Sequence, residues 1–127
     1  MSRAAHLLFI AAFLTATAWA QQPSFLAEAE DVPLPPGLEE TVFGAAFAGA
    51  DGRLVETTAA GETTAEAVRG FYDAAMPPLG WAAIPRSDGP QVFQRGRERL
   101  TISLVQEGPR VHVRYRLVSR AASMALD

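Results

Sequence analysis

The chain has 127 residues, of which 49% are apolar and 20% charged, with no cysteine and a formal net charge of −3. This length fits one domain, and the apolar fraction is too high for an intrinsically disordered chain. The absence of cysteine excludes disulfides and thiolate chemistry, and the acidic balance argues against a general nucleic-acid-binding protein.

Residues 1–20 have the composition of an export signal. Arg3 supplies a positive charge, residues 7–18 are almost entirely apolar, and Ala18-Trp19-Ala20 has the small-x-small pattern that signal peptidase recognises. The apolar run is shorter than the roughly 20 residues that a transmembrane helix needs. We therefore expect a signal peptide cleaved near Ala20, no stable membrane anchor afterwards, and a mature protein that is periplasmic or secreted.

Removal of the signal leaves an uneven distribution of charge. Residues 21–80 carry two arginines and ten acidic residues, a net charge of −8, whereas residues 81–127 carry eight arginines and four acidic residues, a net charge of +4. This asymmetry favours either a basic surface that faces a partner or two halves that pair with each other. The sequence leaves both alternatives open.

Residues 21–38 are rich in proline and acidic residues, which predicts an extended arm. Because Val32, Leu34 and Leu38 are apolar, we expect this arm to lie against the domain. The domain itself is predicted to span residues 39–120. Residues 121–127 are a short tail whose structure the sequence leaves open.

Residues 41–60 predict a β-hairpin around Ala50-Asp51-Gly52. A three-residue loop, in which Gly52 supplies a positive φ, pairs Phe47 with Val55 and keeps this aromatic side chain opposite an apolar neighbour. A two-residue Asp51-Gly52 loop places Phe47 opposite Glu56 instead. We therefore predict the three-residue loop.

A single amphipathic helix is predicted before Pro77. Thr63 and Glu66 have the spacing of a capping box at its N-terminus. Apolar residues then recur at helical spacing and define one buried stripe, namely Val68, Tyr72, Ala75 and Met76. Pro77 ends the helix, Gly80 permits the chain to turn back, and Trp81 is expected to close the end of the core.

The C-terminal part predicts strands in which apolar and polar residues alternate. They are Gln91–Arg95, Arg99–Gln106 and Arg110–Val118, preceded by a short strand at Trp81–Ile84. Two-residue turns at Gly96-Arg97 and Glu107-Gly108 place one set of apolar side chains on a single face, namely Leu100, Ile102, Leu104, Val111, Val113 and Tyr115.

The predicted fold is therefore α+β. It has two layers, with a single helix packed on a twisted antiparallel sheet of about five strands in the order β-β-α-β-β-β. The aromatic residues fall largely on the faces assigned to the core, and we expect them to pack there rather than to form a stacking platform. They are Phe43, Phe47, Phe71, Tyr72, Trp81, Phe93 and Tyr115.

The sequence contains no set of residues typical of an enzyme or a metal site. His112, the one histidine of the mature chain, lies opposite Ser103 in the predicted register, with no acidic third member beside it. The acidic residues lack the spacing of a calcium loop, and no glycine-rich phosphate loop is present. We predict that the protein is not an enzyme and has no catalytic residue, cofactor or metal.

The arginine-rich face of the last strands is the most suggestive feature, and we identify Arg99, His112, Arg114 and Arg116 as a candidate anion-binding site. In the predicted register Arg99 lies opposite Arg116, which is destabilising unless something compensates. The compensating group is either an anionic ligand or an internal carboxylate, that of Glu39, Glu40 or Glu56, or else water simply solvates the arginines.

Three short motifs resemble a group of small exported bacterial proteins. Residues 33–39 read Pro-Leu-Pro-Pro-Gly-Leu-Glu, residues 52–56 read Gly-Arg-Leu-Val-Glu, and Phe71-Tyr72 is followed by Leu79-Gly80-Trp81. The resemblance implies an exported single domain and carries over no catalytic residue.

The expected function is an exported, non-enzymatic interaction or accessory module. Its partner is another envelope protein and not nucleic acid. The alternative is a binder of anionic ligands, such as an acidic glycan, a lipid headgroup or phosphate, through the arginine-rich face. The oligomeric state is left open by the sequence.

Overall fold

A seven-stranded antiparallel sheet is the main element of the computed structural model, which describes residues 24–41 and 44–121. Its strands lie in the order β3-β5-β9-β8-β7-β6, and β4 pairs with the part of β5 that β3 leaves free. The strands are β3 (Leu38–Glu40), β4 (Ala45–Gly49), β5 (Gly52–Glu62), β6 (Ala82–Ala83), β7 (Gln91–Arg95), β8 (Glu98–Glu107) and β9 (Arg110–Arg120).

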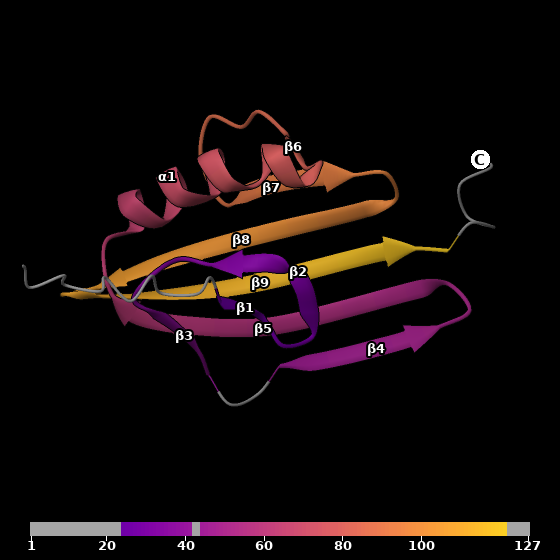
Figure 1. Ribbon diagram of the computed structural model, residues 1–127, viewed down its shortest axis with the longest axis horizontal. Coiled ribbons are helices and arrows are strands. Elements are labelled where there is room, and N and C mark those ends of the chain that lie inside the picture. Colours follow the sequence, from indigo (N-terminus) through magenta and orange to yellow (C-terminus); the bar gives the residue numbers. More distant parts are fainter. Residues whose placement is uncertain (1–23, 42–43, 122–127) are drawn as a thin grey trace, which may run out of the picture.

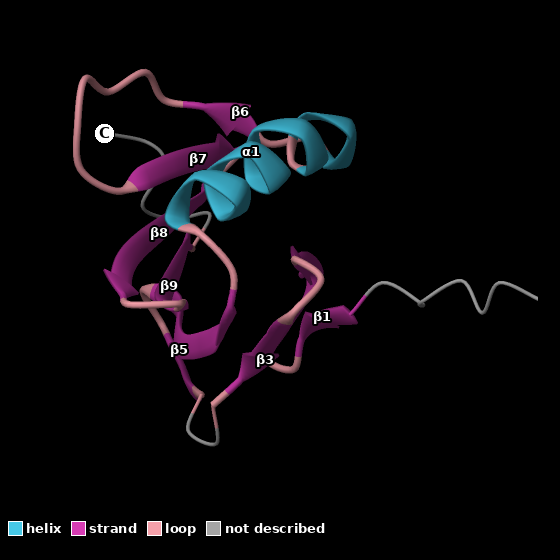
Figure 2. Cartoon of the chain, turned by 90° about the vertical axis from the view of Figure 1, so that its left-hand side faces the viewer, coloured by secondary structure: helices cyan, strands magenta, loops and turns pink. Residues whose placement is uncertain are grey.

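The second layer consists of one helix and one small hairpin on the same side of the sheet. The helix α1 (Ala65–Ala75) is followed by the 3₁₀ turn η1 (Pro77–Leu79), and β1 (Ser24–Leu26) pairs with β2 (Ala29–Leu34) as a separate two-stranded sheet. Figure 1 shows α1 over β7 and β8 and the hairpin over β9 and β5. In Figure 2 both lie on one side of the curved sheet, and no other described helix or strand covers the opposite side.

The predicted α+β class with one helix on an antiparallel sheet is confirmed. The prediction of about five strands is wrong, because the described residues form nine strands in two sheets. Residues 24–40 account for three of them, where an extended arm was predicted. The physical reason is length: the 11-residue helix is about 16 Å long. The 11-residue strand β9 is about 37 Å long, so the helix covers less than half of it.

The β1–β2 hairpin covers the rest of the apolar face. It buries four apolar side chains in the same cluster as those of the helix and the sheet, namely Leu26, Ala29, Val32 and Leu34. The expectation that Val32 and Leu34 lie against the domain therefore agrees with the structure. This segment completes the core rather than extending from it.

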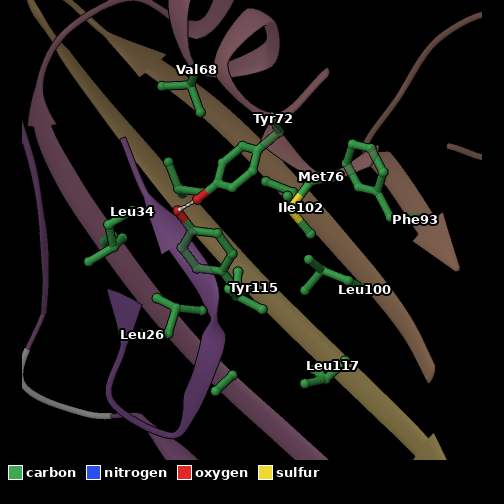
Figure 3. Close-up of a cluster of buried hydrophobic side chains, with 14 of the residues drawn as sticks. Leu26, Leu34, Val68, Tyr72, Met76, Phe93, Leu100, Ile102, Tyr115 and Leu117 are labelled. Carbon is green, nitrogen blue, oxygen red and sulfur yellow. Dashed lines mark hydrogen bonds between the residues drawn. The ribbon is translucent and has the colours of Figure 1, made fainter. Parts of the chain in front are cut away.

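The core lies between the sheet and this second layer (Figure 3). The predicted core face of β8 and β9 is confirmed, because Leu100, Ile102, Val111, Val113 and Tyr115 are at most 1% exposed and Leu104 is partly buried. The helical stripe is confirmed for Val68, Tyr72 and Met76, which are buried, whereas Ala75 is only partly buried. Trp81 closes one end of the core at 2% exposure.

The turn between β8 and β9 differs from the prediction by one step along the chain. The two-residue loop is Gly108-Pro109, with Gly108 at a φ of +57° as the first position of a type II′ turn requires. Leu104 therefore pairs with Val113 and not with Val111. Because this displacement amounts to two residues in register, every side chain keeps its predicted face. The Gly96-Arg97 turn is as predicted, with Phe93 opposite Leu100.

The predicted register of the β4–β5 hairpin is wrong by one residue. Phe47 pairs with Leu54, the loop is Ala50-Asp51, and Phe47 is 62% exposed instead of buried. Gly52 explains this difference, because a Cβ at this position would lie 2.0 Å from the carbonyl oxygen of Ser119 on β9. Gly52 is therefore the first residue of β5, where the absence of a side chain lets β5 lie close to β9, and it is not part of the loop.

The remaining aromatic side chains behave largely as predicted. Tyr72, Trp81, Phe93 and Tyr115 are buried, and Phe71 packs against the core from its edge. Phe43 lies outside the described residues.

The helix begins one residue later than predicted. Thr64, and not Thr63, is the N-cap, and its hydroxyl accepts a hydrogen bond from the backbone N–H of Ala67 at 3.1 Å. Another free N–H of the first helical turn, that of Ala65, donates a hydrogen bond to the side-chain carbonyl of Gln106 on β8 at 2.8 Å. The cap thus combines a local residue with a distant one, whereas the capping box with Glu66 does not form. The helix ends at Ala75, before Pro77, as predicted.

The predicted signal peptide, residues 1–20, lies outside the described residues. Within the described ranges, the structure contains no helix of the length and hydropathy that would be needed to span a membrane.

Candidate functional site

The candidate anion-binding residues lie on the uncovered side of the sheet, which we call the outer face. On β9 this face carries Arg110, His112, Arg114, Arg116, Val118 and Arg120, which alternate with the buried residues of the core. Its neighbours are the outward residues of β5 and β8, including Glu56, Thr58, Ser103 and Val105. The charged side chains of β9 are exposed, because nothing in the described part of the chain covers them.

The register of β8 and β9 changes the predicted neighbours on the outer face. Arg99 lies opposite Val118, so the predicted opposition of Arg99 and Arg116 is absent. His112 lies opposite Val105, and the predicted pairing of His112 with Ser103 is absent as well. The displaced turn moves each partner by two residues along the neighbouring strand, which preserves the face and replaces the neighbour.

Two of the four candidate residues have carboxylate partners. Arg116 lies opposite Glu56 of β5, with 3.5 Å between the guanidinium Nε and the carboxylate Oε1. His112 Nε2 lies 3.1 Å from Oε2 of Glu107. Sequence reasoning missed Glu107 because it placed this residue in the turn, whereas it is the last residue of β8. All four side chains are about half exposed or more, so water screens both contacts.

Arg114 has a different environment at the centre of the outer face. Its neighbours across the sheet are Thr58 on β5 and Ser103 on β8, which are hydroxyl residues and not carboxylates. Among the described residues, Arg114 makes no ion pair. Its positive charge is therefore the least compensated in the row formed by His112, Arg114 and Arg116.

A shallow depression of about 500 Å³ surrounds Arg114. It is lined by His112, Arg114 and three hydroxyl side chains, those of Thr41, Thr58 and Ser103, together with Ala59, Val105 and Val113. The hydroxyls of Thr41 and Thr58 are hydrogen-bonded to each other. A guanidinium beside several hydroxyl donors is an arrangement that binds a carboxylate or a phosphate group.

Arg99 is not part of this depression. It lies four residues from Ser103 on β8, which corresponds to about 13 Å along the strand. The structure thus brings together His112, Arg114 and Arg116 and leaves Arg99 in the row of Val118.

The buried titratable groups belong to the core and not to the outer face. The hydroxyls of Tyr72 and Tyr115 lie 2.6 Å apart, and that of Tyr72 also donates to the carbonyl oxygen of Pro33 at 2.8 Å (Figure 3). Burial raises the pKa of Tyr72, and the neighbouring Tyr115 raises it further. Burial also raises the pKa of Tyr115, to about 12, and the charge of Glu40 adds to this increase. These contacts join helix, sheet and hairpin, which is a structural role.

The acidic and basic halves of the sequence pair with each other in two places. Asp31 on β2 forms an ion pair with Arg95 on β7, and Glu56 on β5 contacts Arg116 on β9. Arg95 also lies over the ring of Trp81, with 4.4 Å from its guanidinium carbon to the ring centroid. Part of the charge asymmetry is therefore compensated internally, whereas Arg114, at the centre of the outer face, has no carboxylate partner among the described residues.

Within residues 24–41 and 44–121, no cluster of three or more histidine, aspartate or glutamate side chains is arranged to hold a metal ion. Comparison of the chain with protein-family models, with curated proteins and with solved structures finds no match.

Proposed function

We propose that the mature chain is an exported, non-enzymatic interaction module that binds an acidic segment of another envelope protein on the outer face. The observation that carries this proposal is the environment of Arg114. This exposed arginine lies at the centre of the uncovered side of the sheet and has hydroxyl neighbours where Arg116 has a carboxylate. An arginine in such a setting presents its full charge and hydrogen-bonding capacity to a carboxylate of a partner.

The open character of the outer face supports a binding function rather than catalysis. Catalytic acids and bases act in sheltered sites where burial and neighbouring charges tune their pKa values. The closest acid–base pair on this face is His112 with Glu107, whose side chains are 48% and 68% exposed. The strongly buried titratable groups, Tyr72 and Tyr115, are engaged with each other inside the core.

A second candidate function, the binding of a small anion, is favoured by the depression around Arg114. Its volume of about 500 Å³ and its hydroxyl lining suit a phosphate group or the carboxylate of an acidic glycan. The two candidates use the same arginine and differ in the size of the ligand.

Two probes distinguish these functions: a fluorescent poly-glutamate peptide, and inorganic phosphate measured by calorimetry. The test variant is Arg114→Gln, and the matched control is Arg86→Gln, which removes the same charge from the connection between β6 and β7. At low salt we expect Arg114→Gln to weaken peptide binding at least about tenfold and Arg86→Gln to weaken it less than about twofold. The affinities of the unchanged protein for the peptide and for phosphate should both fall as salt rises.

Equal losses in the two variants would mean that only net charge matters, and would contradict a site at Arg114. Phosphate binding that depends on Arg114, in the absence of peptide binding, would select the second function. If neither probe binds, both proposals fail.

The proposed export has its own test. Protein recovered from the periplasmic fraction of a cell that expresses the full chain should begin at Gln21 by mass spectrometry, and Ala20→Arg should block this cleavage. An intact chain that remains in the cytoplasm would overturn the assignment of residues 1–20 as a signal peptide.

A further inference from the structure

The edge of the sheet formed by β4 lacks the features that usually prevent strand pairing. Natural edge strands carry charged residues or proline, or are very short. β4 (Ala45–Gly49) contains three alanines, one glycine and Phe47, with no charged residue and no proline. Two other described edges of this sheet are protected: β3 carries Glu39 and Glu40, and β6 has only two residues. This edge is also distinct from the depression around Arg114.

An apolar row crosses the outer face and ends at this edge. Phe47 pairs with Leu54, and Leu54 pairs with Val118 on the other side of β5, so the three side chains lie side by side. Leu54 and Val118 are partly buried, whereas Phe47 is 62% exposed and is the most exposed large apolar side chain of the described residues. The apolar row therefore ends at β4 with a large side chain that no neighbour covers, and a further apolar group beside Phe47 would complete it.

We propose that β4 pairs with β4 of a second copy of this chain, antiparallel and centred on Phe47. This register follows from the strand itself, because Phe47 is the middle residue of Ala45–Gly49. It sets Phe47 opposite Phe47 of the second copy, and Ala46 opposite Ala48 of the second copy. The apolar row then continues without interruption from Val118 and Leu54 of one copy, through the two phenylalanines, to Leu54 and Val118 of the other.

Two-fold symmetry is the argument for a second copy rather than a foreign strand. The mature chain has ten arginines and fourteen acidic residues, a net charge of −4, which opposes the approach of two copies, so a contact between them must bury no further charge. β4 meets this condition, and the backbone N–H and C=O groups on its free side can pair with those of a second strand about 4.8 Å away. Antiparallel pairing about a two-fold axis also stops at two copies, because the β4 edge of each copy is occupied by the other and no free β4 edge remains.

The dimer joins two seven-stranded sheets into one continuous sheet. Because the two-fold axis is perpendicular to the sheet, the two outer faces lie on the same side. Arg114 of each copy stays exposed, and dimerisation is therefore independent of the binding function proposed above.

The oligomeric state of residues 21–127 tests this inference by sedimentation over a range of concentrations. We expect a reversible dimer that Phe47→Lys weakens at least about tenfold, because it removes the aromatic contact and opposes two like charges. The matched control is Val105→Lys, since Val105 is 56% exposed on the same face but lies on β8. This control should dimerise as the unchanged protein does. A wild-type monomer at every concentration would overturn the inference.

A cysteine experiment tests the register as well as the contact. The chain has no cysteine, so Phe47→Cys introduces a single thiol. In the proposed register the two thiols face each other within disulfide distance, and oxidation should cross-link the dimer rapidly. Val105→Cys should not cross-link faster than random collision allows. Equal cross-linking of both variants would overturn the register. A partner from another protein that needs Phe47 while the chain stays monomeric would replace the second copy as the occupant of β4.

Discussion

The two faces of β9 have opposite environments within a single strand. Val111, Val113 and Tyr115 are at most 1% exposed beneath the helix and the hairpin, whereas Arg110, His112, Arg114 and Arg116 point to solvent. Successive side chains of the strand point in turn to the core, which stabilises the fold, and to the outer face, which is exposed to solvent. Stability and the proposed function therefore depend on different faces of the same strand, and four measurements test this separation.

The largest expected effect distinguishes the two faces of β8. Ile102 is fully buried and Val105 is 56% exposed, on opposite faces of this strand. We expect Ile102→Ala to lower the free energy of unfolding by about 2–5 kcal/mol, because it leaves a cavity, and Val105→Ala to lower it by less than about 1 kcal/mol. Urea unfolding of residues 21–127, followed by the fluorescence of Trp81 as their one tryptophan, measures both. Equal losses would mean that the outer face is covered in solution.

Alkaline pH should destabilise the inner face through its two tyrosines. Tyrosine has an ordinary pKa near 10, burial raises the pKa of Tyr115 to about 12, and that of Tyr72 is also raised. Stability is therefore fully present below about pH 10. Above it, the unfolded state ionises first, and the free energy of unfolding falls by about 1.4 kcal/mol per pH unit for each tyrosine.

The composition makes this measurement clean. The chain has no lysine and no cysteine, and arginine keeps its charge in this range, so the two tyrosines are the side chains that titrate. Unfolding free energies measured from about pH 9 to about pH 12 should show the decline, and Tyr115→Phe should halve its slope. A slope that does not change in this variant would contradict the buried pair.

The attachment of the covering layer is tested at the start of α1. Thr64→Ala removes the N-cap hydrogen bond to Ala67 and should cost about 1 kcal/mol of stability. Thr63→Ala, the residue that sequence spacing selected as the cap, should change stability by less than about 0.5 kcal/mol. Thermal unfolding of both variants measures this difference. The reverse order of the two effects would mean that the capping box of Thr63 and Glu66 forms after all.

The smallest effect is expected for the ion pair of Glu56 and Arg116 on the outer face. Its atoms are 3.5 Å apart and both side chains are more than half exposed, so a double-mutant cycle with Gln at each position should give below about 1 kcal/mol. A larger coupling energy would show that the outer face contributes to the fold.

The periodicity of the sequence correctly predicted which side chains are buried in α1, β8 and β9. It did not predict which residues face each other. The turn after β8 shifts the register by two residues, which removes Arg99 from Arg116 and Ser103 from His112 and brings Glu107 to His112. Alternation has a period of two, so it is insensitive to such a shift, while the composition of any site depends on it.

Contacts between distant parts of the chain were also beyond local reasoning. The hairpin of residues 24–34 buries Leu26 and Val32 because α1 is too short to cover β9, which is a property of the assembled sheet. The close approach of Gly52 to Ser119 fixed the β4–β5 register and exposed Phe47, although local apolar pairing favoured Val55. The hydroxyl pair of Tyr72 and Tyr115 joins elements that are 43 residues apart in the sequence.

Local sequence patterns were sufficient to predict the α+β class, the helix with its end before Pro77, and the inward side of the long C-terminal strands. These properties follow from the apolar periodicity and from the backbone limits of proline, which act over a few residues. The neighbours of Arg114, the covering role of residues 24–34 and the position of Phe47 at a sheet edge became visible only in the assembled fold. Those depend on strand register and on the area that each element covers, which are set by the packing of the whole chain.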